Sequence, residues 1–260
     1  MTHQFSICSY SFRRSFESRA MDYRGYVDFN RQHGFAQLDP WMKHIEPALE
    51  NKSWLADAKR MAEDAGLPYG CIAVDGGHMY EEDPAQRALC RETALRWLEI
   101  AAALDAPQMR IDSGGPEALT DEVFEKIVEG YNELIPAAKS AGVEILVENH
   151  WGPTKYAENT VRLLEEVQGL GLLFDTNNWA EGTQERAWQL CAPYARLTHF
   201  KTFSFDSQGY DPSVNLDRAC TILLEKGYKG VWGIESTPED GDEEGAALKT
   251  MALLRRALTG

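Results

Sequence analysis

Residues 143–175 read VEILVENHWGPTKYAENTVRLLEEVQGLGLLFD, and this stretch holds one full repeat of the pattern that decides the fold. A short apolar run at 143–147 is followed by a helical pattern at 159–166 and by a second apolar run at 170–174. Such a unit predicts two parallel strands joined by a crossover helix. Both apolar runs also end directly before an acidic residue.

The same alternation extends outward through the whole chain. The apolar runs are 5–10, 35–38, 69–74, 108–111, 143–147, 170–174, 196–200 and 231–234. The helical patterns are 53–65, 84–104, 121–140, 159–166, 185–190, 216–226 and 245–258. Eight candidate strands in 260 residues predict a closed (β/α)8 TIM barrel, an α/β fold that commonly takes about 250 residues. No linker or break in composition divides the sequence, so we expect a single domain over 1–260.

Charge and cysteine content exclude several classes of protein. The formal net charge of -15 repels phosphate backbones and anionic membranes, and no basic patch offsets it, so we expect no nucleic-acid or membrane partner. The five cysteines include no CxxC pair, which argues against a disulfide framework or a thiolate zinc site. Neither an export signal nor a membrane-length apolar run is present, so we expect a cytoplasmic protein. Phosphate-binding motifs of the GxGxxG and GxxxxGK[ST] types are absent.

The four late strands each end in a side chain that can bind a metal. These side chains are Glu148, Asp175, His199 and Glu235. The carboxyl ends of the strands of a barrel meet at one face, where active sites lie. Alternate residues of a strand point to the same side, and the residues two positions earlier are all apolar or small: Leu146, Leu173, Leu197 and Gly233. The pattern therefore predicts four metal-capable side chains above an apolar barrel interior.

Three carboxylates crowded at a barrel mouth repel one another unless they take up protons or bind a cation. One divalent metal ion resolves this conflict. Three carboxylates and one imidazole suit Mn²⁺, Mg²⁺, Co²⁺ or Zn²⁺, and mixed oxygen and nitrogen ligation favours Mn²⁺. Taken singly, each of these residues could be an ordinary loop start, a helix cap or a structural histidine.

The alternation nominates further residues two positions beyond the ligands. His150, Lys201 and Asn177 follow Glu148, His199 and Asp175 in this way. We interpret His150 as a general acid or base, Lys201 as a group that stabilises an oxyanion, and Asn177 as a substrate contact. The alternatives are that Lys201 pairs with a neighbouring carboxylate and that His150 only makes a supporting hydrogen bond.

Aromatic residues follow the late strands, and they suit stacking against the C–H faces of a sugar or cyclic polyol. Trp151, Trp179 and Phe203 are predicted substrate contacts, although loop packing or an oligomer interface explains them equally well. His78 and Arg110 are further predicted substrate contacts, and Arg110 could instead neutralise Glu144 or Glu148. The remaining candidates from the early strands are Asp39, Trp41 and Asp112.

Four segments resemble the xylose isomerase-like TIM barrel superfamily, which includes sugar and sugar-phosphate isomerases and epimerases, inosose dehydratase, 3-dehydroshikimate dehydratase and endonuclease IV. They are VENH at 147–150, FDTNN at 174–178, THFK at 198–201 and GIES at 233–236. The resemblance implies that Glu148, Asp175, His199 and Glu235 bind the metal. It also implies that Glu148 and Glu235 act as the acid–base pair of an epimerase.

The match is to the superfamily and not to one enzyme. The Gly-Glu-x-x-x-Arg segment of ketose 3-epimerases is missing, and Thr202 stands where inosose dehydratases commonly have an aspartate. Glu148-Asn149-His150 fits the Glu-x-His segment of 3-dehydroshikimate dehydratases.

The favoured function is a metal-dependent isomerase or epimerase of carbohydrate metabolism, acting on a sugar or keto-polyol by removing a proton next to a carbonyl. The alternative is a lyase or dehydratase that uses the same proton abstraction to eliminate a β-hydroxyl or β-glycosyl group. An endonuclease is disfavoured by the net charge, and a barrel that only binds its ligand is disfavoured by the complete set of metal-capable residues. Basic residues near the late strand ends are few, which favours a neutral or carboxylated substrate over a phosphorylated one. A homo-oligomer is compatible with the sequence, which leaves the oligomeric state open.

Overall fold

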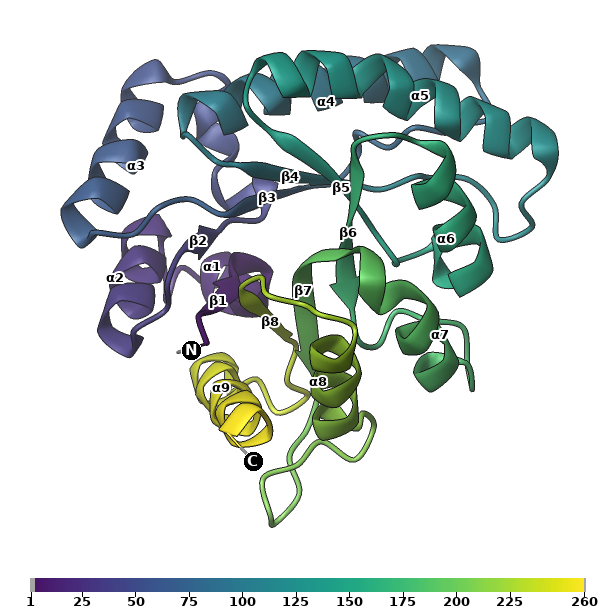
Figure 1. Cartoon of the computed structure of the whole chain (residues 1–260). Helices are drawn as coiled ribbons and strands as arrows, with labels where there is room; N and C mark the ends of the chain where they lie inside the picture. The colour runs from purple at the N-terminus through teal and green to yellow at the C-terminus, as the bar shows by residue number, and fades with distance from the viewer. Residues whose placement is uncertain (1–2, 260) are drawn as a thin grey trace.

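The computed structural model describes residues 3–259, and these form a ring of parallel strands surrounded by helices (Figure 1). The strands are β1 (Phe5–Cys8), β2 (Leu38–Asp39), β3 (Cys71–Val74), β4 (Gln108–Ile111), β5 (Glu144–Glu148), β6 (Leu170–Asp175), β7 (Ala195–Thr202) and β8 (Trp232–Ser236). The α-helices are α1 (Arg13–Glu17), α2 (Tyr23–His33), α3 (Lys52–Ala65), α4 (Pro84–Ala103), α5 (Asp121–Ser140), α6 (Ala157–Glu166), α7 (Gln184–Cys191), α8 (Leu216–Glu225) and α9 (Glu243–Thr259). Short 3₁₀ turns lie at Ser9–Phe12, Met42–His44, Glu46–Leu49, Gly152–Lys155 and Ala192–Tyr194.

The strand order around the ring is β2-β1-β8-β7-β6-β5-β4-β3, and every neighbouring pair is parallel. The ring is nearly closed, because β2 and β3 are joined only by isolated bridges, Leu38 to Tyr69 and Trp41 to Ala73. Backbone hydrogen bonds of 2.8 Å from Gly70 N to Leu38 O and 3.0 Å from Ala73 N to Pro40 O support this junction. The predicted single-domain TIM barrel is the observed fold.

The interior of the barrel and its outer layer hold separate apolar cores. Cys71, Leu146, Leu173 and Leu197 form a small cluster inside the ring, while the larger cluster lies between strands and helices. The three leucines are those predicted below the metal-capable residues. Gly233 occupies the fourth position because a Cβ there would lie 2.2 Å from Thr198 O, so a larger residue would separate β8 from β7.

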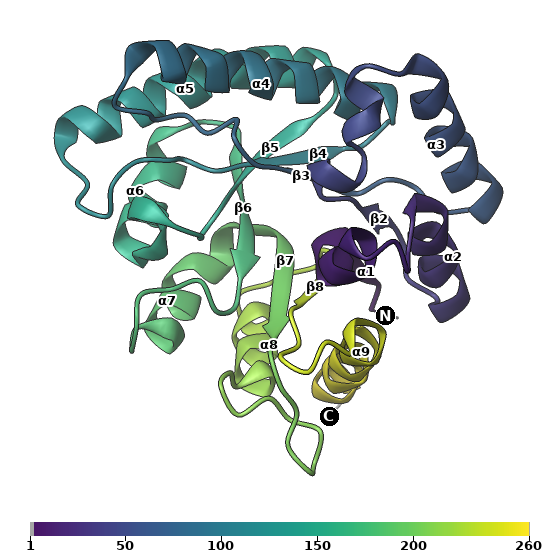
Figure 2. The ribbon, with the colours of Figure 1, turned by 180° about the vertical axis from the view of Figure 1, so that it is seen from behind.

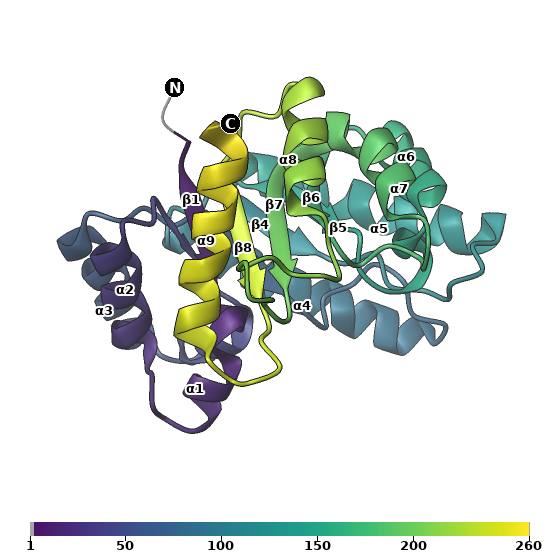
Figure 3. The same ribbon diagram turned by 90° about the horizontal axis from the view of Figure 1, so that it is seen from below.

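The two ends of the barrel differ in what they carry. In Figure 3 the arrows of β7 and β8 point downward, whereas both chain termini lie together at the upper end. The view from behind in Figure 2 shows the same ring of helices around the strands. The carboxyl ends of the strands therefore face the opposite end from the termini. No helix within residues 3–259 is long and apolar enough to cross a membrane.

Two local expectations need correction, both in the first part of the chain. The strand expected at 35–38 is only Leu38–Asp39, because its neighbour β3 pairs with it through single bridges. Helix α2 is absent from the predicted helical patterns. It begins at an N-cap, Asp22, whose side chain accepts a hydrogen bond from Gly25 N, and it ends before Gly34 in the left-handed conformation.

Candidate metal centre

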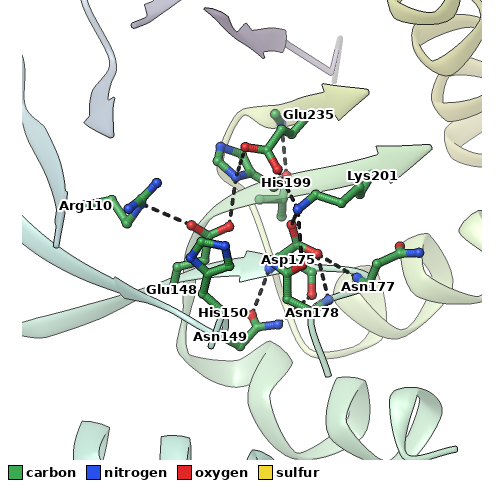
Figure 4. Close-up of polar contacts among 12 residues, drawn as sticks. Arg110, Glu148, Asn149, His150, Asp175, Asn177, Asn178, His199, Lys201 and Glu235 are labelled. Atoms are coloured by element: carbon green, nitrogen blue, oxygen red, sulfur yellow. Dashed lines mark hydrogen bonds and ion pairs between the residues drawn. The ribbon is translucent and has the colours of Figure 1, made fainter. Parts of the chain in front are cut away.

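Strand register brings the four predicted ligands together at the carboxyl end of the barrel. Asp175 pairs with His199 across β6 and β7, and both side chains face the interior. On the next pair of strands, Lys201 lies opposite Glu235. Glu148 ends β5, one strand further along (Figure 4). The predicted convergence of the late strand ends is therefore observed.

The four side chains form one compact, buried cluster. His199 Nδ1 lies 3.0 Å from Glu148 Oε1 and 3.7 Å from Glu235 Oε1. One donor atom from each of Glu148, Asp175, His199 and Glu235 lies within 4.8 Å of the others. All four residues are buried, so water screens their charges poorly.

Asp175 tests whether these residues fit a cation. Its Oδ1 accepts hydrogen bonds from the backbone N–H groups of Asn177 (2.7 Å) and Asn178 (3.0 Å). Its Oδ2 is buried and accepts no hydrogen bond, although Lys201 Nζ lies 3.1 Å away. Burial raises the pKa of Asp175 against the opposing charge of Lys201, and the charges of Glu148 and Glu235 raise it further. Asp175 thus has one oxygen held by backbone N–H groups and one that accepts no hydrogen bond, with two other carboxylates nearby. A divalent cation would stabilise this arrangement.

Lys201 already neutralises part of the cluster. Its ammonium group lies 2.7 Å from Glu235 Oε2 and donates to Asn178 Oδ1 at 3.1 Å. Burial lowers the pKa of Lys201, but the charges of Asp175 and Glu235 outweigh burial and raise it well above its usual value. The alternative that Lys201 pairs with neighbouring carboxylates is therefore observed in this structure.

Arg110 holds the other side of the cluster. Its Nε lies 3.1 Å from Glu148 Oε2, and its Nη1 lies 2.8 Å from Asp75 Oδ1 and 3.3 Å from Asp112 Oδ2. Burial opposes ionisation of Glu148, but the charges of His199 and Arg110 hold the pKa of its carboxyl well below the usual range. Arg110 therefore neutralises Glu148, as one alternative reading of the sequence expected. Glu144 instead pairs with Arg196.

His150 and Trp151 both contact Asp112 beside the cluster. His150 Nδ1 lies 3.1 Å from Asp112 Oδ2, and Trp151 Nε1 donates to the same oxygen at 3.2 Å. Burial lowers the pKa of His150, but the hydrogen bond to Asp112 and the charge of Glu148 outweigh it and raise the pKa to about 9. His150 therefore carries its proton at neutral pH. Trp151 is 43% exposed, so part of this residue remains accessible to solvent.

Residues 27–257 match the family model described as xylose isomerase-like TIM barrel. The chain belongs to the xylose isomerase-like TIM barrel family. No curated protein sequence matches it significantly.

Solved structures of this fold include enzymes of more than one reaction class. D-Allulose 3-epimerase from Methylomonas sp. superimposes with a TM-score of 0.77 at 14% identity, over 98% of this chain and 99% of that one. The probable 3-DHS dehydratase AsbF from Bacillus anthracis gives 0.73 at 16% identity, over 99% of each chain. A xylose isomerase-like TIM barrel protein from Mycobacterium smegmatis, solved in complex with magnesium, gives 0.71 at 16% identity, over 99% of this chain and 98% of that one. At these identities the likenesses show a common fold.

Four predicted substrate contacts have side chains that make no hydrogen bond to the four residues of the cluster. Strand β6 ends at Asp175, so alternation does not carry Asn177 onto the ligand side, and its amide extends away from the cluster in Figure 4. Trp179 is buried, with its ring 6.0 Å from that of Phe174. Phe203 is half-buried in the loop after β7, where its N–H donates to Asp211. His78 contacts Glu81 and the ring of Trp151.

Sequence reasoning missed two residues of this region. Asp75 follows the predicted strand at 69–74 in the same way that Glu148 follows its own strand, so the rule that nominated the four ligands could have found it. Cys8 ends β1 and offers a sulfur within 4.8 Å of donor atoms of His199 and Glu235. Asp39, a candidate from the sequence, accepts a hydrogen bond from Cys71 N at 2.8 Å and so links β2 to β3.

Proposed function

We propose that this protein is a divalent-metal-dependent isomerase or epimerase of a sugar or sugar-like keto-polyol. One observation carries the proposal. At the carboxyl end of this xylose isomerase-like barrel, four buried side chains that can bind a metal lie together: Glu148, Asp175, His199 and Glu235. The mixed oxygen and nitrogen donors favour Mn²⁺, with Mg²⁺, Co²⁺ or Zn²⁺ as alternatives. When bound, such a cation would polarise a carbonyl and an adjacent hydroxyl and so acidify the C–H bond between them.

The two glutamates are not equivalent as bases. Both oxygens of Glu148 are engaged, one near His199 Nδ1 and the other near Arg110 Nε, and its pKa is held low. Glu235 lies 2.7 Å from Lys201 Nζ and 3.7 Å from His199 Nδ1, and neither of its oxygens contacts Arg110. We therefore assign proton removal to Glu235. Glu148 is its partner in the proposed acid–base pair, and it must take up a proton before it can return one on the other side of the reacting carbon.

The surrounding residues suit a neutral or carboxylated substrate. Lys201 is the cation closest to Glu235 and can hold a substrate oxygen that gains negative charge. Arg110 is occupied by three carboxylates, so it serves to orient Glu148 and is not free to bind a substrate anion. Trp151 is partly exposed beside Asp112, where its ring could pack against the C–H groups of a sugar.

A lyase or dehydratase is the second candidate, and His150 favours it. Because His150 is protonated at neutral pH and partly exposed, it could donate a proton to a departing hydroxyl or glycosyl oxygen. Proton removal by Glu235 would be common to both reactions. The fate of the β-oxygen separates them: an epimerase retains it, and a lyase releases it as water or alcohol.

Metal content is the first test of the proposal. Purified protein is stripped with a chelator, reloaded with Mn²⁺ and analysed by inductively coupled plasma mass spectrometry. We expect the wild type to retain about one equivalent after gel filtration and Asp175→Asn to retain almost none, because the amide removes one anionic ligand. Asp217→Asn on the exposed start of α8 is the matched control and should bind like the wild type.

The reaction class is tested in D₂O with a panel of ketoses and keto-polyols. Incorporation of solvent deuterium without loss of oxygen supports an epimerase or isomerase, and formation of an unsaturated product supports a lyase. A wild-type protein that holds no metal under any loading condition would overturn the ligand assignment and with it the proposed function.

A further inference from the structure

A second group of metal-capable side chains lies outside the candidate metal centre. His78 and Glu81 belong to the segment after β3, and Cys90 lies in α4. His78 Nε2 lies 2.5 Å from Glu81 Oε1 and 3.7 Å from Cys90 Sγ. One donor atom from each of the three lies within 4.8 Å of the others. This cluster combines a sulfur, a nitrogen and an oxygen donor. It therefore differs from the candidate metal centre of Glu148, Asp175, His199 and Glu235, which we call the main centre from here on.

The backbone holds this cluster in place without any metal. Met79 N donates to Asp112 O at 3.3 Å and Tyr80 N donates to Ser113 O at 2.9 Å, so the segment is fastened to the end of β4. The segment passes so close to Gly114 that a Cβ there would lie 2.8 Å from His78 Cδ2. Cys90 is fixed by the second turn of a long helix. Two of the three side chains therefore start from rigid positions, which lowers the ordering cost of binding a ligand.

We propose that His78, Glu81 and Cys90 form a second metal site, specific for Zn²⁺ or a similar thiophilic divalent ion. A thiolate ligand selects such ions over Mg²⁺ and Mn²⁺, which prefer oxygen donors. Three protein ligands leave the fourth tetrahedral position to water. The site is independent of the proposed catalytic function, because it shares no residue with the main centre.

The distances suit a tetrahedral ion after one small movement. With Zn–S near 2.3 Å and Zn–N near 2.0 Å, sulfur and nitrogen ligands lie about 3.5 Å apart, close to the 3.7 Å between Cys90 and His78. The His78–Glu81 distance is that of a direct hydrogen bond, so the carboxylate must retreat by somewhat less than about 1 Å. The Glu81 side chain is 40% exposed and can make this movement. On binding, the Cys90 thiol releases its proton to solvent.

The surroundings leave these side chains available. Arg87 donates to the backbone oxygen of Glu81 and not to its carboxylate, while Arg91 pairs with Glu133. A surface hollow of about 280 Å³ beside the cluster gives solvent a route to Glu81. It is lined by Tyr80, Glu81, Glu82, Gly115, Pro116 and Trp151.

Occupation of this site would also restrain the mouth of the barrel. The ring of His78 stands edge-on to that of Trp151, with centroids 5.4 Å apart. Trp151 in turn donates to Asp112, which contacts His150 and Arg110. A metal ion on the imidazole would therefore fix the face against which Trp151 packs.

Cobalt absorption spectroscopy tests the second site directly. Protein saturated with Mg²⁺ to occupy the main centre is titrated with Co²⁺, and the thiolate-to-cobalt charge-transfer band is recorded. We expect the band in the wild type and in Asp175→Asn, and its loss in Cys90→Ser and His78→Ala. Cys8→Ser is the matched control, because Cys8 is the thiol next to the main centre, and it should keep the band.

Three outcomes would overturn the proposal: no thiolate band in the wild type, a band that survives Cys90→Ser, or a band that disappears in Cys8→Ser. If Cys90→Ser or His78→Ala does not fold, a second measurement, on protein in which His78, Glu81 and Cys90 are unchanged, still tests the proposal. Zinc-edge X-ray absorption of zinc-loaded Asp175→Asn should show one sulfur neighbour at about 2.3 Å. A zinc shell with only oxygen and nitrogen neighbours would contradict the site.

Discussion

The late strand ends of the barrel and the early ones both carry charged side chains, but they balance their charges differently. At the ends of β5 to β8, Glu148, Asp175 and Glu235 are crowded together, and Asp175 Oδ2 accepts no hydrogen bond. At the ends of β3 and β4, the guanidinium of Arg110 lies between Asp75 and Asp112. The late half, at the ends of β5 to β8, places three carboxylates around Lys201 and His199, whereas the early half, at the ends of β3 and β4, places two around Arg110.

This difference shows how one barrel mouth can separate two tasks. The early half is neutralised by its own arginine and therefore keeps its geometry whether or not a metal is bound. The late half has more carboxylates than cationic groups, and under the proposed function the repulsion among these carboxylates would favour binding of a divalent ion. Arg110 touches both halves through Glu148, so it orients this proposed metal ligand from the early side.

The largest expected effect comes from a substitution in the late half and concerns the rate of catalysis. Glu235→Gln removes the proposed base and should lower the rate of solvent deuterium exchange by about 10²–10⁴-fold. Asp75→Asn, the matched change in the early half, should lower it by less than about tenfold, because Arg110 keeps two other carboxylate partners. Metal content is measured in both variants so that lost chemistry is separated from lost metal. Equal losses in both variants would contradict the division of tasks.

The next largest expected effect comes from a substitution in the early half and concerns the stability of the fold. Arg110→Met leaves Asp112 and Glu148 buried without their shared cation, which should lower the free energy of unfolding by about 3–5 kcal/mol. Urea unfolding of the metal-free protein at neutral pH measures it. The control is Arg196→Met, whose side chain is 56% exposed beside Glu144 and should cost less than about 1 kcal/mol. Similar losses in the two variants would show that Arg110 does not hold the early half together.

The third prediction concerns how the free energy of unfolding depends on pH through His44, which follows β2 near the early half. Burial lowers the pKa of His44, which stacks on Phe16, to about 4. Between this pKa and the unfolded value of about 6.5 the unfolded chain binds more protons, so stability falls as pH falls through that window. Because His44 is partly exposed, we expect a loss of only about 1 kcal/mol relative to His44→Gln between about pH 7 and about pH 5.

Urea unfolding of His44→Gln and the wild type in parallel cancels the carboxylates that also titrate near this range. Parallel stability curves for the two proteins would show that His44 titrates normally in the folded state.

The smallest effect removes one hydrogen bond from the early half. Trp41 Nε1 donates to Asp75 Oδ2 at 2.6 Å, and Trp41→Phe keeps an aromatic ring while it removes the donor. Asp75 is 42% exposed, so water can replace the lost donor, and we expect a loss of about 0.5–1 kcal/mol in the free energy of unfolding. A loss above about 2 kcal/mol would mean that Asp75 depends on Trp41 more than on Arg110.

The sequence predicted the late half of the molecule better than the early half, for physical reasons. In the late half a charged residue ends each apolar run, so alternation alone identified the four residues of the buried cluster and the leucines beneath three of them. Helix α5 was predicted with its observed bounds, Asp121–Ser140, and its cap at Thr120 accepts from Val123 N. Strong periodicity and standard caps need no knowledge of tertiary contacts.

In the early half, local patterns were weaker and tertiary contacts decided the outcome. Strand β2 has only two residues and is held by neighbours that the sequence does not reveal. Helix α2 contains Gly25 and buries Asn30, whose side-chain amide donates to Tyr26 O, so its apolar stripe is interrupted. The ion pairs of Arg110 join three different strands, and no spacing within the sequence announces them.

The weak pairing between β2 and β3 affects where the barrel opens locally in its native state. Its few backbone hydrogen bonds include Leu38 N to Pro68 O and Gly70 N to Leu38 O, whereas the other neighbouring strands pair over registered ladders, with one irregularity in the β6–β7 pair between Leu172 and Leu173. Amide protons of Leu38 and Gly70 should therefore exchange with deuterium through partial opening, ahead of those in β6 and β7. The junction of β2 and β3 is therefore the place in the ring where the chain could be cut with the least loss of strand pairing.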